Sequence, residues 1–596
     1  MPELSEAEID RWRGRLAYAR KVWIEHGILG SDRPSTMRVL LELYRGDQWK
    51  HVSWENLGID ADELRVVNKV FPAANQIQAE IASRNPRVLV LPRSPASLQV
   101  LPAWEALLQY DVEEQDHIRQ ENAALRDHLF AQFGCVRHGF TPRKEFFAEG
   151  RGGKTRRLQT YRAARPDRPW IRRVAPWNVL MTPDAEAFHA DGGLWWVAFR
   201  DLISLEDLRA NPGYVYFDGI EELATAPPRE LREMRTYEME QAGTDPDQEK
   251  RVEVWTVYEA RERTWFSITV AGPKKALRRQ DDWPLPWESL PVNVLAVNEQ
   301  PDTAFAVPLL EQIIPIQEEM NLLRTMTSRF VRQIRRIVGL NENLVAPETL
   351  RKLVDGDLVE FFSFHGDPQQ AVKEITVGGF PGQDLILYGA QLDEDFRETI
   401  GQSKMGRAQR INVESATEAA GVLAGQDVAT FRVEEAFHRF QQEVLTLYAQ
   451  ARRATLALTG PEVVRLVGET DAQGIQGFAT VDPGAVGDDL DYGIEIGSSR
   501  RRTREQEIQR AGALLSISLQ SPQIFQVAYF ARRLAEAAGL DPSKALSRES
   551  LGAGQQMGEA ALPVGGAPGQ PAQAGAEFPG IDANLIAMLS GRGGNA

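Results

Sequence analysis

The stretch Ala306–Thr430 constrains the fold more than any other part of the chain. Leu, Ile and Met recur at helical spacing in Pro308–Arg324, and a second helix is predicted at Gln383–Ile400 after a small insert. A polar break rich in Gly, Lys and Arg, Ser403–Arg410, precedes a further long helix at about Ser415–Leu458. Two helices that flank a compact insert have apolar sides that a single chain leaves uncovered. We therefore predict contact with identical neighbours.

The composition is that of a folded protein with several cores. The chain has 596 residues, of which 43% are hydrophobic and 26% charged, and it contains 13 Trp. Its single cysteine, Cys135, excludes an intrachain disulfide and a cysteine-cluster metal site, and suits a reducing compartment. Met1–Arg20 is charged throughout and does not resemble a signal peptide. The apolar runs are shorter than the roughly 20 residues of a membrane-spanning helix, so we expect no membrane contact.

The charge distribution bears on nucleic acids. A formal net charge of −16 argues against tight binding of nucleic acid over a broad surface, but not against a protein that lets DNA pass. Basic residues cluster at the end of the first predicted helix and in the polar break: Arg324, Arg329, Arg332, Arg335, Arg336, Lys404, Arg407 and Arg410. One interpretation is contact with passing phosphates, which repetition around a ring would strengthen. The other is a solvated face balanced by acids, or ion pairs between subunits.

The first half of the chain divides by pattern. Residues 1–135 are predicted to be mainly helical, with one amphipathic helix over Leu101–Phe133 and another over Ala73–Ser83 that ends before Pro86 and is followed by a short strand. Residues 136–305 are predicted to be rich in strands, with a helix at Ser204–Asn211. The predicted strand segments are Val174–Met181, Leu194–Phe199, Val252–Tyr258 and Trp265–Val270. The alternation in Val252–Val257 favours a half-exposed antiparallel strand.

The insert is predicted to be a small α/β unit with strand Ile337–Leu340, helix Pro347–Val354 and strand Asp357–Phe364. Its last strand carries a heavy apolar load: Leu358, Val359, Phe361, Phe362 and Phe364. These side chains form either the core of the insert or a surface for adjacent subunits and docking partners.

The helices around the insert also have marked features. The second one carries an apolar stripe with acids between, at Leu385, Leu392 and Phe396. We expect this stripe to be buried by the paired helix and by neighbouring copies, with Asp393, Glu394 and Asp395 lining a channel or facing outward. Gly421 and Gly425 in the long helix indicate a kink or close packing.

The C-terminal part contains short strands over residues 461–500, and then helices at Thr503–Leu519 and Gln523–Ala538. From about Gly552 the sequence is rich in Gly, Ala and Pro, which predicts disorder. The apolar cluster Ile581–Leu589 is either a docking peptide or a remnant helix.

One motif suggests an enzyme. Ala148–Thr155 fits a relaxed P-loop pattern, so the alternative function is a P-loop ATPase of a DNA packaging or processing machine that uses Gly150–Thr155. The preceding stretch is half charged, however, and Pro166 and Pro169 follow where a P-loop needs a helix. The segment fits a β-hairpin with its tip at Gly150–Gly153 better. The eight histidines show no metal-ligand spacing.

Several weak motifs stand in the order in which tailed-bacteriophage portal proteins carry them. They are Tyr44–Trp49, Asn68–Pro72 with Arg84–Pro86, Val174–Val179, and Pro308–Asn321. Over about residues 35–545 the chain resembles this family of head-to-tail connectors. The resemblance implies an α+β, multidomain portal fold, with a helical stem and crown, a β-rich wing and a small α/β clip.

The resemblance also implies a division of the chain. The expected parts are the N-terminal helical part of the wing (1–135), the β-rich wing (136–305), the first stem helix (306–336), the clip (337–378), the second stem helix (379–402), the tunnel loop (403–414), the long kinked wing helix (415–460), the crown (461–551) and a disordered tail (552–596).

The function implied is that of a ring, usually of twelve copies, at one capsid vertex of the virion, assembled in the host cytoplasm. It would conduct double-stranded DNA without sequence specificity during packaging and ejection. Its partners would be the terminase large subunit, a tail adaptor, and capsid and scaffolding proteins. The expected DNA-facing residues are Lys404, Arg407, Arg410, Arg329, Arg332, Arg335 and Arg336, and the expected clip docking residues are Leu358, Phe361, Phe362 and Phe364. No enzyme activity, cofactor or metal is expected.

Overall fold

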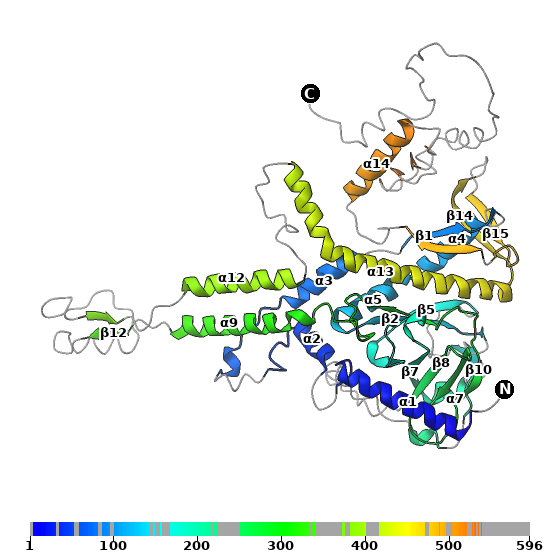
Figure 1. Cartoon of the computed structure of the whole chain (residues 1–596), viewed down its shortest axis with the longest axis horizontal. Coiled ribbons are helices and arrows are strands. Elements are labelled where there is room, and N and C mark those ends of the chain that lie inside the picture. The colour runs from blue at the N-terminus through cyan, green and yellow to red at the C-terminus, as the bar shows by residue number, and fades with distance from the viewer. Residues whose placement is uncertain are drawn as a thin grey trace, which may run out of the picture.

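The chain is a mixture of helices and sheets, in which a broad body carries a long helical projection (Figure 1). The computed structural model describes residues 4–30, 35–52, 59–81, 86–95, 100–143, 147–149, 155–157, 167–216, 219–223, 251–333, 337–340, 372–375, 382–400, 416–470, 476–487, 489–495, 504–520, 527, 530, 531, 534, 535 and 538. Within these ranges no helix combines the length and apolar character needed to cross a membrane.

The N-terminal part is helical, as the sequence predicts. Its described elements are α1 (Glu6–Glu25), α2 (Thr36–Arg45), α3 (Val70–Ile81), β1 (Val88–Pro92), α4 (Leu101–Glu114) and α5 (His117–Phe130). The prediction of one helix over Leu101–Phe133 is wrong, because the chain turns between α4 and α5 at Asp116, whose φ of 51° is left-handed. Aspartate is one of the few residues other than glycine that adopt this conformation, so the turn needs no Gly or Pro.

The predicted β-rich region forms antiparallel sheets with the strand orders β10-β9-β8-β7-β6 and β11-β2-β5. The strands are β2 (Gly134–Phe140), β5 (Pro169–Val174), β6 (Val179–Met181), β7 (Trp196–Ser204), β8 (Arg251–Glu259), β9 (Thr264–Ile268), β10 (Arg278–Asp282) and β11 (Val292–Leu295). The helix predicted after β7 is confirmed as α7 (Leu205–Ala210). Its first turn is capped by Ser204, whose Oγ accepts the Asp207 N–H at 3.2 Å.

Strand β8 is antiparallel as predicted, but the prediction that it is half-exposed is wrong, because Trp255–Tyr258 are all buried. The sheet is covered on both faces. Trp12 of α1 meets Phe266 edge-on with ring centroids 5.4 Å apart, and on the opposite face the Arg137 guanidinium of β2 lies 4.4 Å from the Phe199 ring. Alternation assigns a side chain to a face but does not say whether another layer covers that face.

The projection consists of two helices that lie side by side (Figure 1). Helix α9 (Ile314–Gln333) leaves the body and α12 (Gly382–Thr399) returns to it, and both confirm predicted helices. At the far end β12 (Ile337–Leu340), a predicted strand, pairs antiparallel with β13 (Val372–Ile375). The predicted helix Pro347–Val354 and strand Asp357–Phe364 lie outside the described residues.

A helix of 44 residues, α13 (Ala416–Thr459), crosses the body and confirms the predicted long helix. Its N-terminal part, which carries both glycines, bends away from the rest (Figure 1). The elements that follow are β14 (Glu462–Thr470), β15 (Gln476–Val481), β16 (Leu490–Ile494) and α14 (Arg504–Gln520). The predicted helix at 523–538 lies mostly, and the tail at 552–596 wholly, outside the described residues.

The P-loop-like segment has strands on both sides. Strand β3 (Phe147–Glu149) pairs antiparallel with β4 (Thr155–Arg157), which confirms the predicted hairpin, while residues 150–154 lie outside the described structure. A P-loop joins a strand to the first turn of a helix. Strand β4 therefore occupies the position in which a P-loop nucleotide site has its helix.

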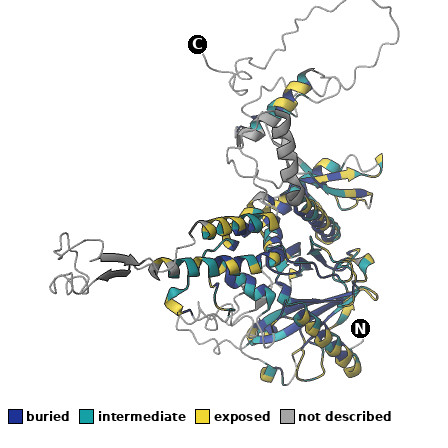
Figure 2. Cartoon of the chain, turned by 60° about the vertical axis from the view of Figure 1, so that its left-hand side comes forward, coloured by how far each residue is buried: buried dark blue, intermediate teal, exposed yellow. Residues whose placement is uncertain are grey.

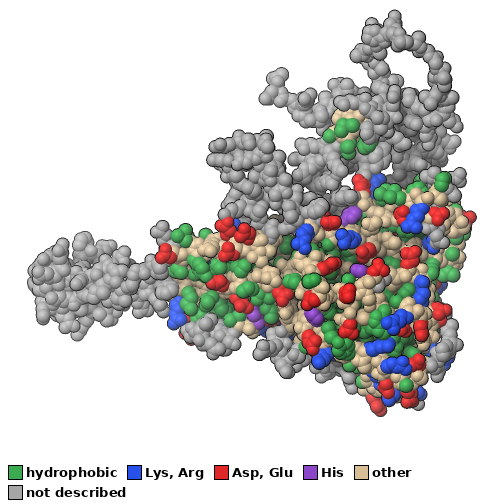
Figure 3. All heavy atoms as spheres, viewed as in Figure 1, with side chains coloured by type: hydrophobic (Ala, Val, Ile, Leu, Met, Phe, Trp, Pro, Cys, Tyr) green, Lys and Arg blue, Asp and Glu red, His purple; other side chains and the backbone are tan. Residues whose placement is uncertain are grey.

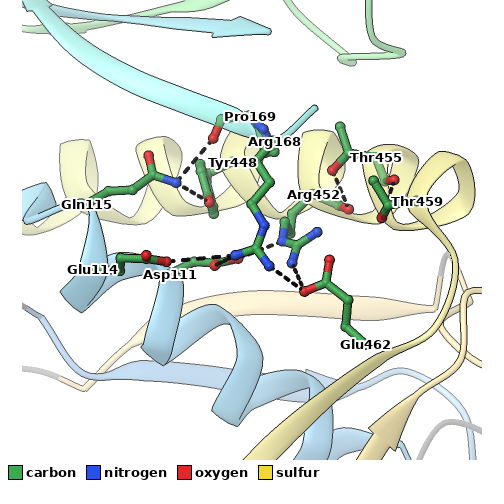
Figure 4. Close-up of polar contacts among 10 residues, drawn as sticks. All are labelled: Asp111, Glu114, Gln115, Arg168, Pro169, Tyr448, Arg452, Thr455, Thr459 and Glu462. Atoms are coloured by element: carbon green, nitrogen blue, oxygen red, sulfur yellow. Dashed lines mark hydrogen bonds and ion pairs between the residues drawn. The ribbon is translucent and has the colours of Figure 1, made fainter. Parts of the chain in front are cut away.

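A buried ion network joins α13 to the rest of the body (Figure 4). Arg452, whose side chain is 0% exposed, donates from Nε to Asp111 Oδ2 of α4 at 2.6 Å and from Nη2 to Glu462 Oε2 of β14 at 2.7 Å. Arg168, just before β5, contacts the same two acids at 3.2 and 2.7 Å. Arg168 also lies 3.7 Å from Glu114 Oε2 of α4, so two cations share three acids and tie together four segments that are far apart in the sequence.

Candidate functional site: the stem and its anchor

The stem, defined here as α9 and α12, buries an apolar seam inside one chain. Leu392 and Phe396 of α12 are 5% and 3% exposed, and they belong to one core with Met320 of α9. Tyr388 donates its hydroxyl hydrogen to Glu319 Oε1 across the pair. The apolar stripe that the sequence singles out is therefore covered at Leu392 and Phe396 within the chain. The expectation that the paired helix buries this stripe is confirmed at these two positions, and neighbouring copies are not needed to cover them.

A different apolar face of the stem has no cover among the described residues. Ile386 and Leu387 of α12 are 73% and 62% exposed, and Val331 of α9 is 57% exposed. Figure 2 shows exposed residues along the stem, and Figure 3 shows hydrophobic side chains interspersed with acidic ones on its visible face. Adjacent positions on a helix lie about 100° apart, so Ile386 and Leu387 together leave a broad apolar side of α12 open to water. Contiguous patches of this kind mark interaction sites.

Polar side chains buried on α9 fasten the stem to the body. Gln317, Asn321 and Thr325 are 0%, 1% and 0% exposed, and their spacing of four places them on one face of the helix. The anchor segment, defined here as residues 59–69, runs along this face. Its part from 64 to 69 belongs to no helix or strand.

From Arg65 to Lys69, every second residue of the anchor segment is hydrogen-bonded to this face. The bonds are Arg65 N–H to Thr325 Oγ1 at 3.0 Å, Val67 N–H to Asn321 Oδ1 at 2.9 Å and Lys69 N–H to Gln317 Oε1 at 3.1 Å. Gln317 Nε2 also donates to the Val67 carbonyl at 2.7 Å. The two repeats match, because four helical residues rise about 6 Å and two extended residues span about 6.6 Å. The side chains of α9 thus accept the backbone hydrogen bonds that an extended segment otherwise makes to a neighbouring strand.

This ladder brings together two of the sequence motifs. Asn321 Nδ2 donates to Gln48 Oε1 at 2.5 Å, and Trp49 Nε1 donates to the Arg65 carbonyl at 3.1 Å. Gln48 and Trp49 belong to the first portal-like motif, and Asn321 belongs to the last. These residues identified the motifs, but their mutual contact was not predicted. The sequence feature that could have revealed it is the spacing of four residues between Gln317, Asn321 and Thr325 on one helix.

One ion pair from the anchor segment and one histidine–carboxylate hydrogen bond just before it connect the body to both stem helices. Lys69 Nζ lies 3.0 Å from Asp393 Oδ1 of α12, and His51 Nε2 lies 3.0 Å from Glu318 Oε1 of α9. Asp393 is also paired with Arg397. The acidic side chain of Asp393, expected to line a channel or face outward, is thus engaged inside the chain.

Most of the predicted DNA-facing and docking side chains lie outside the described structure. Arg329 of α9 is described, and its Nε lies 3.8 Å from Glu63 Oε2 of the anchor segment. Arg332 belongs to α9 but its side chain is not described. The remaining predicted positions outside the described residues are Arg335, Arg336, Leu358, Phe361, Phe362, Phe364, Lys404, Arg407 and Arg410. Their roles stay predictions. In the described part of the chain, no three His, Cys, Asp or Glu side chains gather as metal ligands.

The ladder gives a direct prediction. We expect Asn321→Leu to speed amide hydrogen exchange across residues 64–69, because it removes the acceptor of the Val67 N–H and leaves Gln48 Oε1 without its donor. Each buried polar group left without a partner costs about 1–3 kcal/mol. Exchange followed by mass spectrometry on peptides covering residues 60–72 checks this. Arg324→Leu, an exposed position on the same helix, serves as the control. Equal exchange in Asn321→Leu and wild type would show that the ladder does not hold the segment.

The structure thus defines a mixed α and β protein with a projecting, anchored helical stem. No protein-family model and no curated protein matches the chain.

Proposed function

We propose that the chain is a portal protein, the subunit of a ring that forms the channel for double-stranded DNA at one capsid vertex. The observation that carries the proposal is the stem. The two stem helices bury an apolar seam between them, and a ladder of buried hydrogen bonds holds the stem to the body. The β12–β13 pair lies at its far end, and Ile386 and Leu387 are exposed on its side. The portal-like order of the sequence motifs supports the same conclusion.

An open apolar side on a projecting stem favours contact between copies. Each Å² of apolar surface removed from water contributes about 25 cal/mol of favourable free energy, against which the entropic cost of association stands. When a patch on one copy meets a different face of the next copy, the contact is head-to-tail, and such contacts close into a ring if the rotation allows. A rigid stem favours closure because every copy must present the patch at the same angle, and the anchor ladder supplies that rigidity.

The charge of the stem suits passage of DNA rather than capture. Asp384 is exposed on α12, and acids intersperse with its apolar residues. An acidic bore repels phosphates, so DNA slides instead of binding. In this proposal Lys404, Arg407 and Arg410 of the tunnel loop form a positively charged ring around the DNA. The ring has twelve copies, and its partners are the terminase, the tail adaptor and the capsid.

The stem face provides the test. We expect the double variant Ile386→Asp, Leu387→Asp to stay folded but to lose the ring, because each assembled copy would bury two unpaired charges in an apolar contact. Native mass spectrometry at matched concentrations should show assemblies for the wild type and single chains for the variant. Val270→Asp adds one charge at an exposed apolar position of the wing, 40% exposed, and should leave assembly intact. Assemblies of equal mass in all three proteins would exclude the stem face as an interface.

A further inference from the structure

A cavity of ≈ 360 Å³ lies at the base of the stem. It forms where the end of α1, the start of α2, the turn after α5 and the loop leading into α9 meet. The lining residues that matter chemically are Glu25, His26, Gln132, Gln300 and Glu311. This volume is near the lower end of the roughly 300–1,000 Å³ that small-molecule sites occupy.

The lining contains one buried hydrogen-bond acceptor without a donor among the described residues, and a partly buried carboxyl. Gln132 is 7% exposed and donates from Nε2 to the His26 carbonyl, while its Oε1 has no partner among the described residues. Burial raises the pKa of the Glu311 carboxyl above its usual value, and no described cation lies close enough to oppose that shift. A buried acceptor without a donor is costly, so a ligand that donates hydrogen bonds here would be stabilised.

The charges around the cavity also favour a ligand that donates hydrogen bonds, in particular a positively charged one. Glu25 stands at the end of α1, a 20-residue helix whose C-terminal carbonyls carry partial negative charge. The charged lining groups are acids. Burial lowers the pKa of His26, whose ring stacks on Phe305 with centroids 4.0 Å apart, so this imidazole is neutral at pH 7. No lysine or arginine stands among the described lining residues, and Glu25 is paired only at 3.8 Å with the exposed Lys21, outside the lining.

We propose that this cavity binds a guanidinium or alkylammonium group, with Gln132 and Glu311 as hydrogen-bond acceptors. A guanidinium has five N–H donors in one plane and can donate to several acceptors at once. A bare divalent cation, with ligands at about 2.0–2.6 Å, would fill only a small part of the space. The group belongs either to a free small molecule or to a side chain of a second copy. The proposal rests on the cavity and does not depend on a DNA channel.

Agmatine, in which a four-carbon chain links a guanidinium to a primary ammonium, is the probe. Isothermal titration of the full chain should show binding of agmatine but not of N-butylurea, which has a similar chain and neither positive charge. Glu311→Gln and Gln132→Leu should each weaken agmatine binding by about tenfold or more, since the first removes a negative charge and replaces one acceptor oxygen with a donor, and the second removes the unpaired acceptor Oε1. Glu299→Gln, which removes the same charge at an exposed position beside the lining residue Gln300, should change binding less than about twofold.

The source of the group follows from repeating the titration at two protein concentrations. Equal binding by single chains and by assembled chains indicates a free small molecule. Binding by single chains alone, together with weaker assembly of Glu311→Gln, indicates a side chain of a second copy. Agmatine that binds neither form, or binds Glu311→Gln as well as wild type, overturns the proposal.

Discussion

Arg452→Met should lower the free energy of unfolding by about 3–5 kcal/mol, because it removes one partner of a buried ion network and leaves its acids uncompensated. Arg452 binds Asp111 and Glu462, and burial already raises the pKa of the Asp111 carboxyl. Arg168 remains in the variant, but one guanidinium cannot neutralise both carboxylates. Urea unfolding at pH 7, followed by tryptophan fluorescence, measures the loss.

Arg439→Met is the matched control for this prediction. Arg439 lies on the same helix, is 69% exposed, and forms only a 3.8 Å pair with Glu435. An exposed pair of this type contributes about 0–1 kcal/mol, so the control should unfold close to wild type. Arg452→Lys should fall between the two, because an ammonium keeps the charge but cannot bridge two acids as a guanidinium fork does. A loss below about 1 kcal/mol for Arg452→Met would show that the network does not hold α13 to the body.

Acid should destabilise the fold sharply below about pH 6.5. Burial lowers the pKa of His117 to about 3 and the pKa values of His128 and His138 to about 4. The unfolded chain binds these protons below about pH 6.5 and the folded chain does not, so their stabilisation is present above that pH and is lost as pH falls. Burial raises the pKa of Glu121 to about 7, so its contribution has the opposite sign and is lost as pH rises toward 7.

The three histidines and the opposing Glu121 together predict that the free energy of unfolding rises by about 3 kcal/mol per pH unit between about pH 4.5 and pH 6. His117→Phe should reduce this slope by about 1.4 kcal/mol per pH unit. The replacement fits because His117 Nε2 has no partner among the described residues and its ring packs edge-on against Tyr448 at 4.8 Å. Glu121→Gln should steepen the slope by a similar amount, since Gln can still accept the Gln441 amide hydrogen.

Urea midpoints measured at pH 7, 6 and 5 test both variants of this pair. His189→Phe, at an exposed ring, should follow wild type. If His117→Phe and wild type lose stability in parallel, the buried imidazoles take up protons in the folded state and the explanation fails.

Local signals in the sequence were sufficient for several elements. Ser204 at the start of α7 and the apolar spacing of α12 and α13 identify helices without tertiary information, and the charged surroundings of residues 150–153 identify a hairpin. The turn at Asp116 was missed because aspartate is common in helices as well as in left-handed turns. The full burial of Trp255–Tyr258 was missed because it depends on α1 and β2, which lie far away in the sequence.

The stem was predictable as a pair of helices, but its partners were not. Leu392 and Phe396 were expected to be buried by the paired helix and by neighbouring copies, and the chain covers them by itself. The face that stays open, at Ile386 and Leu387, has no distinguishing pattern because it continues a run of apolar residues. The burial of Gln317, Asn321 and Thr325 was not predicted, because polar residues on one face of a helix normally face water. Their partner is backbone, which leaves no side-chain signature in the sequence.

Electron microscopy of the purified chain, with its mass measured in parallel, tests the central claim most directly. The proposal predicts closed rings, about twelve copies in number, with stems packed around a central opening wide enough for duplex DNA. Particles of single chains, or of dimers without an opening, would contradict it.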